Sequence, residues 1–152
     1  MTYEPGAALR ALHDADVRYV LTGSLAGVLH GSPVLTDEVE LCHDADPANV
    51  ERLATVLAAM GTAEVPALPE LRRDRVEVTT DHGRIATDPR PHGTHGYADL
   101  IAAAERMDVG GFAVDVAALD DVLRVMRATY RQRDRVEVET LLALRDEITE
   151  SS

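Results

Sequence analysis

The sequence predicts an α/β fold in which helices pack on a small mixed β-sheet, and two observations lead to this. Short runs rich in Val, Ile and Thr alternate with longer segments whose apolar residues recur at helical spacing. The chain has 152 residues, of which 45% are hydrophobic, so we expect one domain with one core over residues 1–152. Aromatic residues make up only 3%, so Leu, Val, Ala and Ile must build that core.

The first part of the chain predicts alternating helices and strands. We expect helices at residues 4–16, 24–31 and 46–61, and strands at residues 17–23 and 37–43. Ser24 is placed to cap the second helix and Gly31 to end it. Asp46 and Pro47 begin the third helix in the same way, and Gly61 ends it.

The second part carries weaker signals. We expect a proline-containing loop at residues 62–73, a hairpin at 74–88 that turns near 81–83, and a Gly/Pro/His loop at 89–96. The remaining elements are a helix at 97–107, a Gly-Gly turn and strand within 108–119, and helices at 120–130 and 135–147. An arginine-rich elbow joins the last two helices.

Composition excludes several classes of function. The net charge of −12 disfavours general binding to nucleic-acid backbone, because phosphate contacts need clustered cations; a local arginine patch could still serve. The chain has fifteen arginines and no lysine, which excludes a lysine nucleophile. The single cysteine, Cys42, excludes a disulfide framework. The sequence also shows no leader peptide and no apolar stretch long enough to span a membrane. Together with the single cysteine, this predicts a cytoplasmic protein.

Residues 22–41, TGSLAGVLHGSPVLTDEVEL, combine the parts of a phosphate and metal site. Gly23 and Ser24 open a helix, whose free N–H groups and positive dipole end suit a phosphate. Glu38 and Glu40 lie two residues apart on a strand and therefore share one face. Paired carboxylates bind Mg²⁺ or Mn²⁺, as nucleotidyl transfer requires. The alternative is that both glutamates form the solvated side of an amphipathic strand.

This segment resembles the nucleotidyltransferase superfamily typified by polymerase beta. In that family an apolar strand leads to Gly-Gly or Gly-Ser, and Asp-x-Asp follows on the next strand; thirteen residues separate Ser24 from Glu38 here. The chain is more closely similar, over about residues 15–145, to small bacterial nucleotidyltransferase-like proteins, including a toxin-type group related to abortive-infection proteins. The similar segments are SLAGVLHGSPVLT, DADPANVERLATVLAAMG, GTHGYADL and DDVLRVMRA.

The resemblance implies a minimal nucleotidyltransferase fold. It also implies metal-dependent transfer of a nucleoside monophosphate from an NTP to an acceptor hydroxyl, on an RNA end, a protein or a small molecule. The residues implied are Gly23, Ser24 and Arg133 for the nucleotide, Glu38 and Glu40 for Mg²⁺ or Mn²⁺, and Glu38, Glu40 and Asp88 for catalysis.

The sequence also departs from the family pattern. Glu-x-Glu replaces Asp-x-Asp, and Ala86 stands at the expected third acidic position, with Asp88 two residues on and on the same face. Val34 replaces a basic residue, and Glu137 matches an acidic position near the C-terminus only loosely. These departures motivate a second hypothesis, an inactive fold that serves as a binding or regulatory module, such as one component of a toxin–antitoxin pair. A third is an acidic adaptor that binds no nucleotide.

Other basic residues have two interpretations each. The arginines between residues 124 and 135 could hold a triphosphate or an RNA end, or could complement a helix dipole. His92 and His95 indicate a surface loop more than a metal site. The resemblance implies that Gly93 to Tyr97 of this loop shape the rim of the site. A second arginine group, interpreted as surface charge, comprises Arg72, Arg73 and Arg75.

Overall fold

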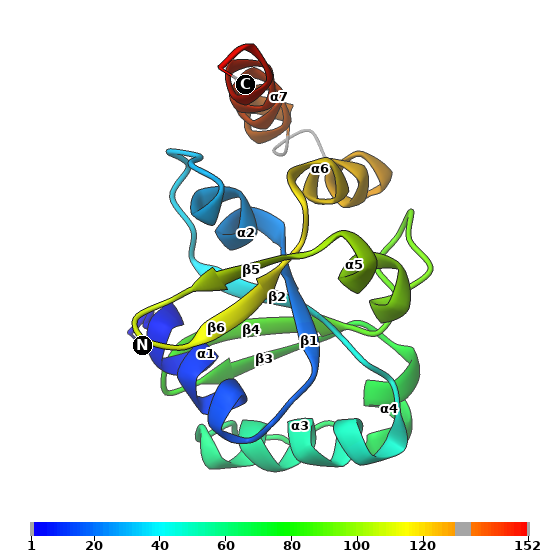
Figure 1. Cartoon of the computed structure of the whole chain (residues 1–152). Coiled ribbons are helices and arrows are strands. Elements are labelled where there is room, and N and C mark those ends of the chain that lie inside the picture. Colours follow the sequence, from blue (N-terminus) through cyan, green and yellow to red (C-terminus); the bar gives the residue numbers. More distant parts are fainter. Residues whose placement is uncertain (1, 130–134, 152) are drawn as a thin grey trace.

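The computed structural model describes residues 2–129 and 135–151, in which six strands form one mixed sheet of order β3-β4-β2-β1-β6-β5 (Figure 1). The strands are β1 Tyr19–Thr22, β2 Glu38–His43, β3 Val76–Thr80, β4 Gly83–Asp88, β5 Glu105–Asp108 and β6 Ala113–Val116. β1 runs antiparallel to β2 and parallel to β6, while β2 runs parallel to β4. This confirms the predicted α/β class with a mixed sheet.

Helices cover both faces of this sheet. They are α1 Pro5–Asp14, α2 Gly23–Leu29, α3 Pro47–Ala59, α4 Leu68–Arg73, α5 Tyr97–Ala103, α6 Leu119–Ala128 and α7 Arg135–Glu150. In Figure 1, α2, α6 and α7 lie on one side of the sheet, and α1, α3 and α4 lie on the other. Within the described residues, none of these helices has the length and apolarity that a membrane span requires.

The core is aliphatic, as the composition predicts. Its buried cluster consists of Leu, Val, Ala, Ile and Met side chains with Cys42, and Tyr19 is its one aromatic member among the described residues. Val39 and Leu41 of β2 are each 1% exposed, on the face opposite Glu38 and Glu40. The alternation predicted for this strand is therefore present, because successive side chains point to opposite faces.

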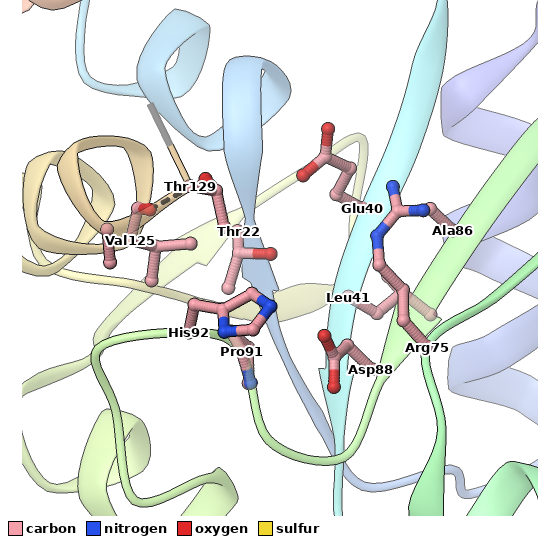
Figure 2. A pocket seen from close by; sticks show the side chains of 11 residues that line it. Thr22, Glu40, Leu41, Arg75, Ala86, Asp88, Pro91, His92, Val125 and Thr129 are labelled. Carbon is pink, nitrogen blue, oxygen red and sulfur yellow. Dashed lines mark hydrogen bonds between the residues drawn. The ribbon is translucent and has the colours of Figure 1, made fainter. Parts of the chain in front are cut away.

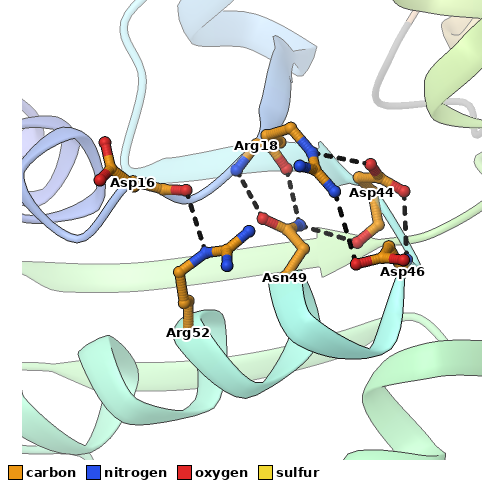
Figure 3. Close-up of polar contacts among 6 residues, drawn as sticks. All are labelled: Asp16, Arg18, Asp44, Asp46, Asn49 and Arg52. Atoms are coloured by element: carbon orange, nitrogen blue, oxygen red, sulfur yellow. Dashed lines mark hydrogen bonds and ion pairs between the residues drawn. The ribbon is translucent and has the colours of Figure 1, made fainter.

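A buried asparagine holds the ends of β1 and β2 together (Figure 3). The Asn49 amide accepts a hydrogen bond from the N–H of Arg18 (2.7 Å) and donates to the carbonyls of Arg18 (3.0 Å) and Asp44 (2.8 Å). The Arg18 guanidinium also donates to the Asp44 carboxylate at 2.9 Å. These bonds favour the register in which Thr22, at the other end of β1, lies beside Glu40.

Two sequence predictions in the second part are wrong. The segment predicted as a loop contains α4, because Pro69 is tolerated in a first helical turn and Leu71 is fully buried. The helix predicted to run to residue 107 ends at Ala103, and residues 105–108 form β5 instead. β5 pairs antiparallel with β6 across the Gly-Gly turn, and this pairing overrides the local helical pattern.

Candidate active site

A cleft of about 400 Å³ opens on the sheet face that carries the two glutamates (Figure 2). Thr22, Glu40 and Ala86 are neighbouring Cα partners on β1, β2 and β4, so their side chains share this face. Asp88, two residues along β4, lines the same cleft, and Val125 of α6 closes one side. The sheet therefore supplies two carboxylates, Glu40 and Asp88, to one cavity.

Gly23 determines how closely α2 approaches the acidic strand. Its φ is +71°, a conformation that L-residues rarely adopt, and a Cβ at this position would lie 2.7 Å from Cδ of Glu40. The Glu40 carboxylate thus packs directly on the backbone of the first residue of α2. The Gly-Ser turn and the acidic strand, which the sequence analysis linked, are brought together here.

Glu38 is half-buried on the same strand face as Glu40, but it does not line the cleft. Its Cα partner on β4 is Arg84, and its carbonyl accepts a hydrogen bond from the Tyr3 hydroxyl at 3.4 Å. Within residues 2–129 and 135–151, no three His, Cys, Asp or Glu side chains gather closely enough to hold a metal ion.

Ser24 is not the N-cap that the sequence predicts. α2 begins at Gly23 with Thr22 as its N-cap, so Ser24 lies inside the first turn. Its hydroxyl donates to Oε2 of Glu137 at 2.9 Å, which joins α2 to α7 across 113 residues. The other carboxylate oxygen, Oε1 of Glu137, is buried and has no hydrogen-bond partner within residues 2–129 and 135–151. Spacing along the chain gave no signal for this contact.

The arginines near the end of α6 divide into different environments. Arg133 lies outside the described residues. Arg124 donates to Asp99 at 3.1 Å and pairs with Asp121 at 3.2 Å, so two carboxylates of the same chain neutralise its positive charge. Hydrogen bonds from the His95 N–H and from Arg124 lower the pKa of Asp99. Burial, the larger effect at Asp121, raises the pKa of that carboxyl.

The sequence analysis gave Arg75 no place in this site, and it assigned His92 to a surface loop. Arg75, taken there as surface charge, lines the cleft, and its guanidinium pairs with Glu77 at 3.2 Å. Figure 2 shows its side chain reaching over β4 toward Glu40. His92 and Pro91 also line the cleft, whereas residues 93–97, which the resemblance implied for its rim, do not. The sequence feature that could have predicted this location was the position of Arg75 just before a strand.

Cys42 is fully buried on the glutamate side of β2, and its thiol lies 3.8 Å from the Pro89 carbonyl. Burial, followed by the charges of Asp88, Asp44 and Asp99, raises its pKa to about 12. The thiol therefore stays protonated and is no nucleophile. This agrees with its interpretation as a small buried residue.

Two solved structures are similar to this chain in fold over nearly its whole length. The lincosamide antibiotic adenylyltransferase LnuA, in its lincomycin-bound form, is 16% identical, with a TM-score of 0.67 over 94% of this chain and 98% of its own. A Thermotoga maritima protein provisionally assigned as a nucleotidyltransferase is also 16% identical, with a TM-score of 0.58 over 98% of this chain and 97% of its own. The protein has the nucleotidyltransferase fold. No family model and no curated protein matches the sequence.

The nucleotidyltransferase fold confirms the architecture that the resemblance implied. At 16% identity the likeness concerns the fold alone, so the acceptor and the roles of Glu38, Glu40 and Asp88 remain predictions. The toxin-type kinship likewise remains a prediction.

Proposed function

We propose that this protein transfers a nucleoside monophosphate from an NTP to an acceptor hydroxyl. The observation that carries the proposal is the packing of the Glu40 carboxylate on Gly23, which sets an acidic strand against the Gly-Ser turn of a nucleotidyltransferase fold. Phosphoryl chemistry of this kind depends mainly on positioning and on neutralising the triphosphate. The cleft beside this contact offers carboxylates and an arginine at close range.

In this proposal the backbone at Gly23 and the hydroxyl of Ser24 bind the β/γ-phosphates, and Arg133 assists. A serine hydroxyl has one proton to donate, and Ser24 donates it to Glu137. A phosphate that takes this bond must therefore turn the hydroxyl away from α7. Arg75, at the edge of the cleft, adds a guanidinium suited to phosphate oxygens.

The residues fit a magnesium ion that shares its coordination with substrate. Mg²⁺ is usually held by one or two carboxylates together with substrate phosphates and water, rather than by an all-protein cage. Glu38 and Glu40 are suited to hold it, and it would supply charge neutralisation at the triphosphate. Asp88, in the same cleft, is placed to accept the proton of the acceptor hydroxyl.

A second candidate function is an inactive nucleotidyltransferase fold that binds or regulates a partner, as in a toxin–antitoxin pair. The specific observation that favours it is Ala86, whose backbone is paired directly with Glu40 and which offers no third carboxylate. Under this hypothesis, substituting Glu38 and Glu40 by glutamine leaves biological activity intact.

Calorimetric titration with ATP, GTP, CTP and UTP, with and without Mg²⁺ or Mn²⁺, tests the main proposal. We expect metal-dependent binding that the Glu38→Gln/Glu40→Gln variant loses. The matched control is Glu51→Gln/Glu64→Gln, which removes the same charge from exposed residues outside the cleft. Absence of binding at millimolar NTP would contradict the transferase, and equal binding by both variants would contradict the assigned metal ligands.

A further inference from the structure

A second cleft, of about 690 Å³, lies on the other side of the loop at residues 89–96. Arg72 and Arg73 of α4 and Arg90 of the loop line it, together with His95 and Tyr97. Arg72 and Arg73 carry no sequence signal beyond surface charge, and nothing in the sequence links them to Arg90. The fold places all three around one cavity, which we name the arginine cleft.

Unlike most of the described arginines, those of this cleft have no acidic partner among residues 2–129 and 135–151. Within residues 2–129 and 135–151, the side chains of Arg72 and Arg90 make no hydrogen bond or ion pair, and Arg73 donates only to the Pro69 carbonyl of its own helix. Most of the described arginines instead pair with carboxylates, and these are Arg10, Arg18, Arg75, Arg84, Arg106, Arg124, Arg135 and Arg145.

This grouping leaves the arginine cleft positively charged in an acidic protein. The chain carries 27 acidic residues against 15 arginines, so a carboxylate partner is available for most cations. The one carboxylate that lines the cleft, Asp44, already accepts a hydrogen bond from Arg18 at 2.9 Å. Within the described residues, Arg72 and Arg90 therefore keep all their guanidinium donors available to a ligand, and Arg73 keeps those on its two Nη atoms.

We propose that the arginine cleft binds the phosphate groups of the acceptor, which is a nucleoside phosphate either free or at the end of a single strand. A guanidinium fork matches the oxygens of a phosphate, and an aromatic ring such as Tyr97 is a surface on which a base stacks. The cavity volume falls within the usual range for small ligands, about 300–1,000 Å³. It therefore suits a short segment and not a duplex.

The loop between the two clefts supports an acceptor role, which rests on the proposed function. Asp88, Pro91 and His92 line the first cleft, whereas Pro89 and Arg90 line the arginine cleft. The backbone N–H of Arg90 donates to the carboxylate of Asp88 at 2.8 Å. A ligand held by Arg90 thus lies next to the residue proposed as the base in the first cleft.

Direct binding tests the proposal without any turnover. A 5′-phosphorylated tetra-adenylate, AMP and inorganic phosphate are each titrated into the wild-type protein, into Arg72→Gln/Arg73→Gln and into Arg90→Gln. The matched control is Arg52→Gln, because among the described residues this α3 arginine has no ion pair and its side chain donates only to the Asp16 carbonyl. We expect each cleft arginine removed to weaken binding of the tetranucleotide roughly tenfold, and the control to bind as the wild type does.

Salt dependence provides a second readout. Each phosphate contact to a single strand contributes about 0.7 to the slope of log affinity against log salt, so Arg90→Gln should lower the slope by about that amount. Equal binding of AMP and the tetranucleotide supports a free nucleotide as the ligand, and tighter binding of the tetranucleotide supports a strand end. Affinities unchanged in the arginine variants, or no binding of any probe, would overturn the proposal. Absence of NTP binding by the wild-type protein would instead refute the proposed transferase. That outcome would leave the measured binding of the phosphate probes to the arginine cleft unaffected.

Discussion

Gly23 has a φ of +71°, and a Cβ added there would lie 2.7 Å from Cδ of Glu40. Gly23→Ala must therefore strain the backbone and displace the carboxylate. We expect the free energy of unfolding to fall by about 1–3 kcal/mol from the backbone strain alone, and by more once the contact is included. Urea denaturation followed by circular dichroism measures this.

Gly110 provides the matched control for that substitution. Its φ of +69° is nearly the same, but apart from its chain neighbours no described residue has an atom within 4 Å of its added Cβ. Gly110→Ala should therefore show the backbone cost without the contact. A Gly23→Ala variant that loses no more stability than Gly110→Ala would argue against the packing of Glu40 on α2.

His43 is fully buried and predicts a dependence of stability on pH. Its Nε2 lies 2.6 Å from the Leu71 carbonyl, which can only accept, so Nε2–H donates and Nδ1 accepts from the Thr87 hydroxyl. Burial, the largest effect, lowers the pKa of this imidazole. The unfolded chain therefore binds a proton below about pH 6.5 that the folded chain does not bind.

The stability that neutral His43 contributes is therefore present above the pKa of the unfolded chain. It is lost as the pH falls from about 6.5 toward the pKa of the folded chain. For one proton the slope cannot exceed about 1.4 kcal/mol per pH unit. Denaturation curves between about pH 7 and pH 5 measure it. His43→Gln can keep both hydrogen bonds without titrating, so an equal slope in that variant would contradict the assignment.

At the scale of elements, the pairing of β2 with β4 makes a test of the metal site. Ala86 is the Cα partner of Glu40 on one side and of Glu77 of β3 on the other. Ala86→Asp therefore introduces a carboxylate between two others, and neighbouring like charges are destabilising. We expect Ala86→Asp to have a lower unfolding midpoint than wild type in the presence of a chelator. Adding Mn²⁺ should raise the midpoint of this variant more than it raises that of wild type.

A matched variant separates the metal effect from a general loss of stability. Ala86→Asn has a similar size and no charge, so Mn²⁺ should raise its unfolding midpoint no more than it raises that of wild type. If Mn²⁺ raises the midpoints of both variants equally, the ion is not bound by the carboxylates of this strand group.

The docking of α7 on α2 is a second feature of the elements. Leu141 is fully buried, and a Cβ added at Gly27 of α2 would lie 3.1 Å from its Cδ2, so the two helices are in close contact. Leu141→Ala should lower the free energy of unfolding by about 2–5 kcal/mol. Because Glu137 of the same helix accepts from Ser24, NTP affinity should change as well.

Leu142, next along α7 and only partly buried, serves as the control for that variant. We expect Leu142→Ala to cost less stability and to leave NTP affinity unchanged. Equal effects of the two substitutions on NTP affinity would indicate that α7 does not act through its contact with α2. Calorimetry under the conditions of the nucleotide titration compares them.

For the whole molecule, the net charge of −12 predicts that salt stabilises the fold. Like charges repel across a compact protein, and the Debye length falls to about 10 Å at 0.1 M salt. Individual surface ion pairs contribute about 0–1 kcal/mol each, so their screening should not cancel the relief of this repulsion. The melting temperature by circular dichroism should therefore rise from about 0.01 M to about 0.3 M NaCl. A fall would mean that ion pairs such as Arg18–Asp44 dominate.

Local signals predicted most of the first part of the fold. Asp46, Pro47 and Gly61 mark the ends of a helix through backbone preferences that act within a few residues, and α3 does run from Pro47 to Ala59 between them. The alternation in β2 predicted which side chains face the core, because that period is a property of the strand itself. Such signals failed at β5, where pairing with β6 outweighs the helical pattern of residues 97–107.

The sequence by itself determined the fold class, the opening of α2 at Gly23 and the acidic face of β2. Only the tertiary structure decided that Ser24 donates to Glu137, 113 residues away, and that Arg72 and Arg73 share a cavity with Arg90. The physical reason is the range of the interactions. Backbone preference and hydrophobic period act over neighbouring residues, whereas a site depends on which distant segments the packed core brings together.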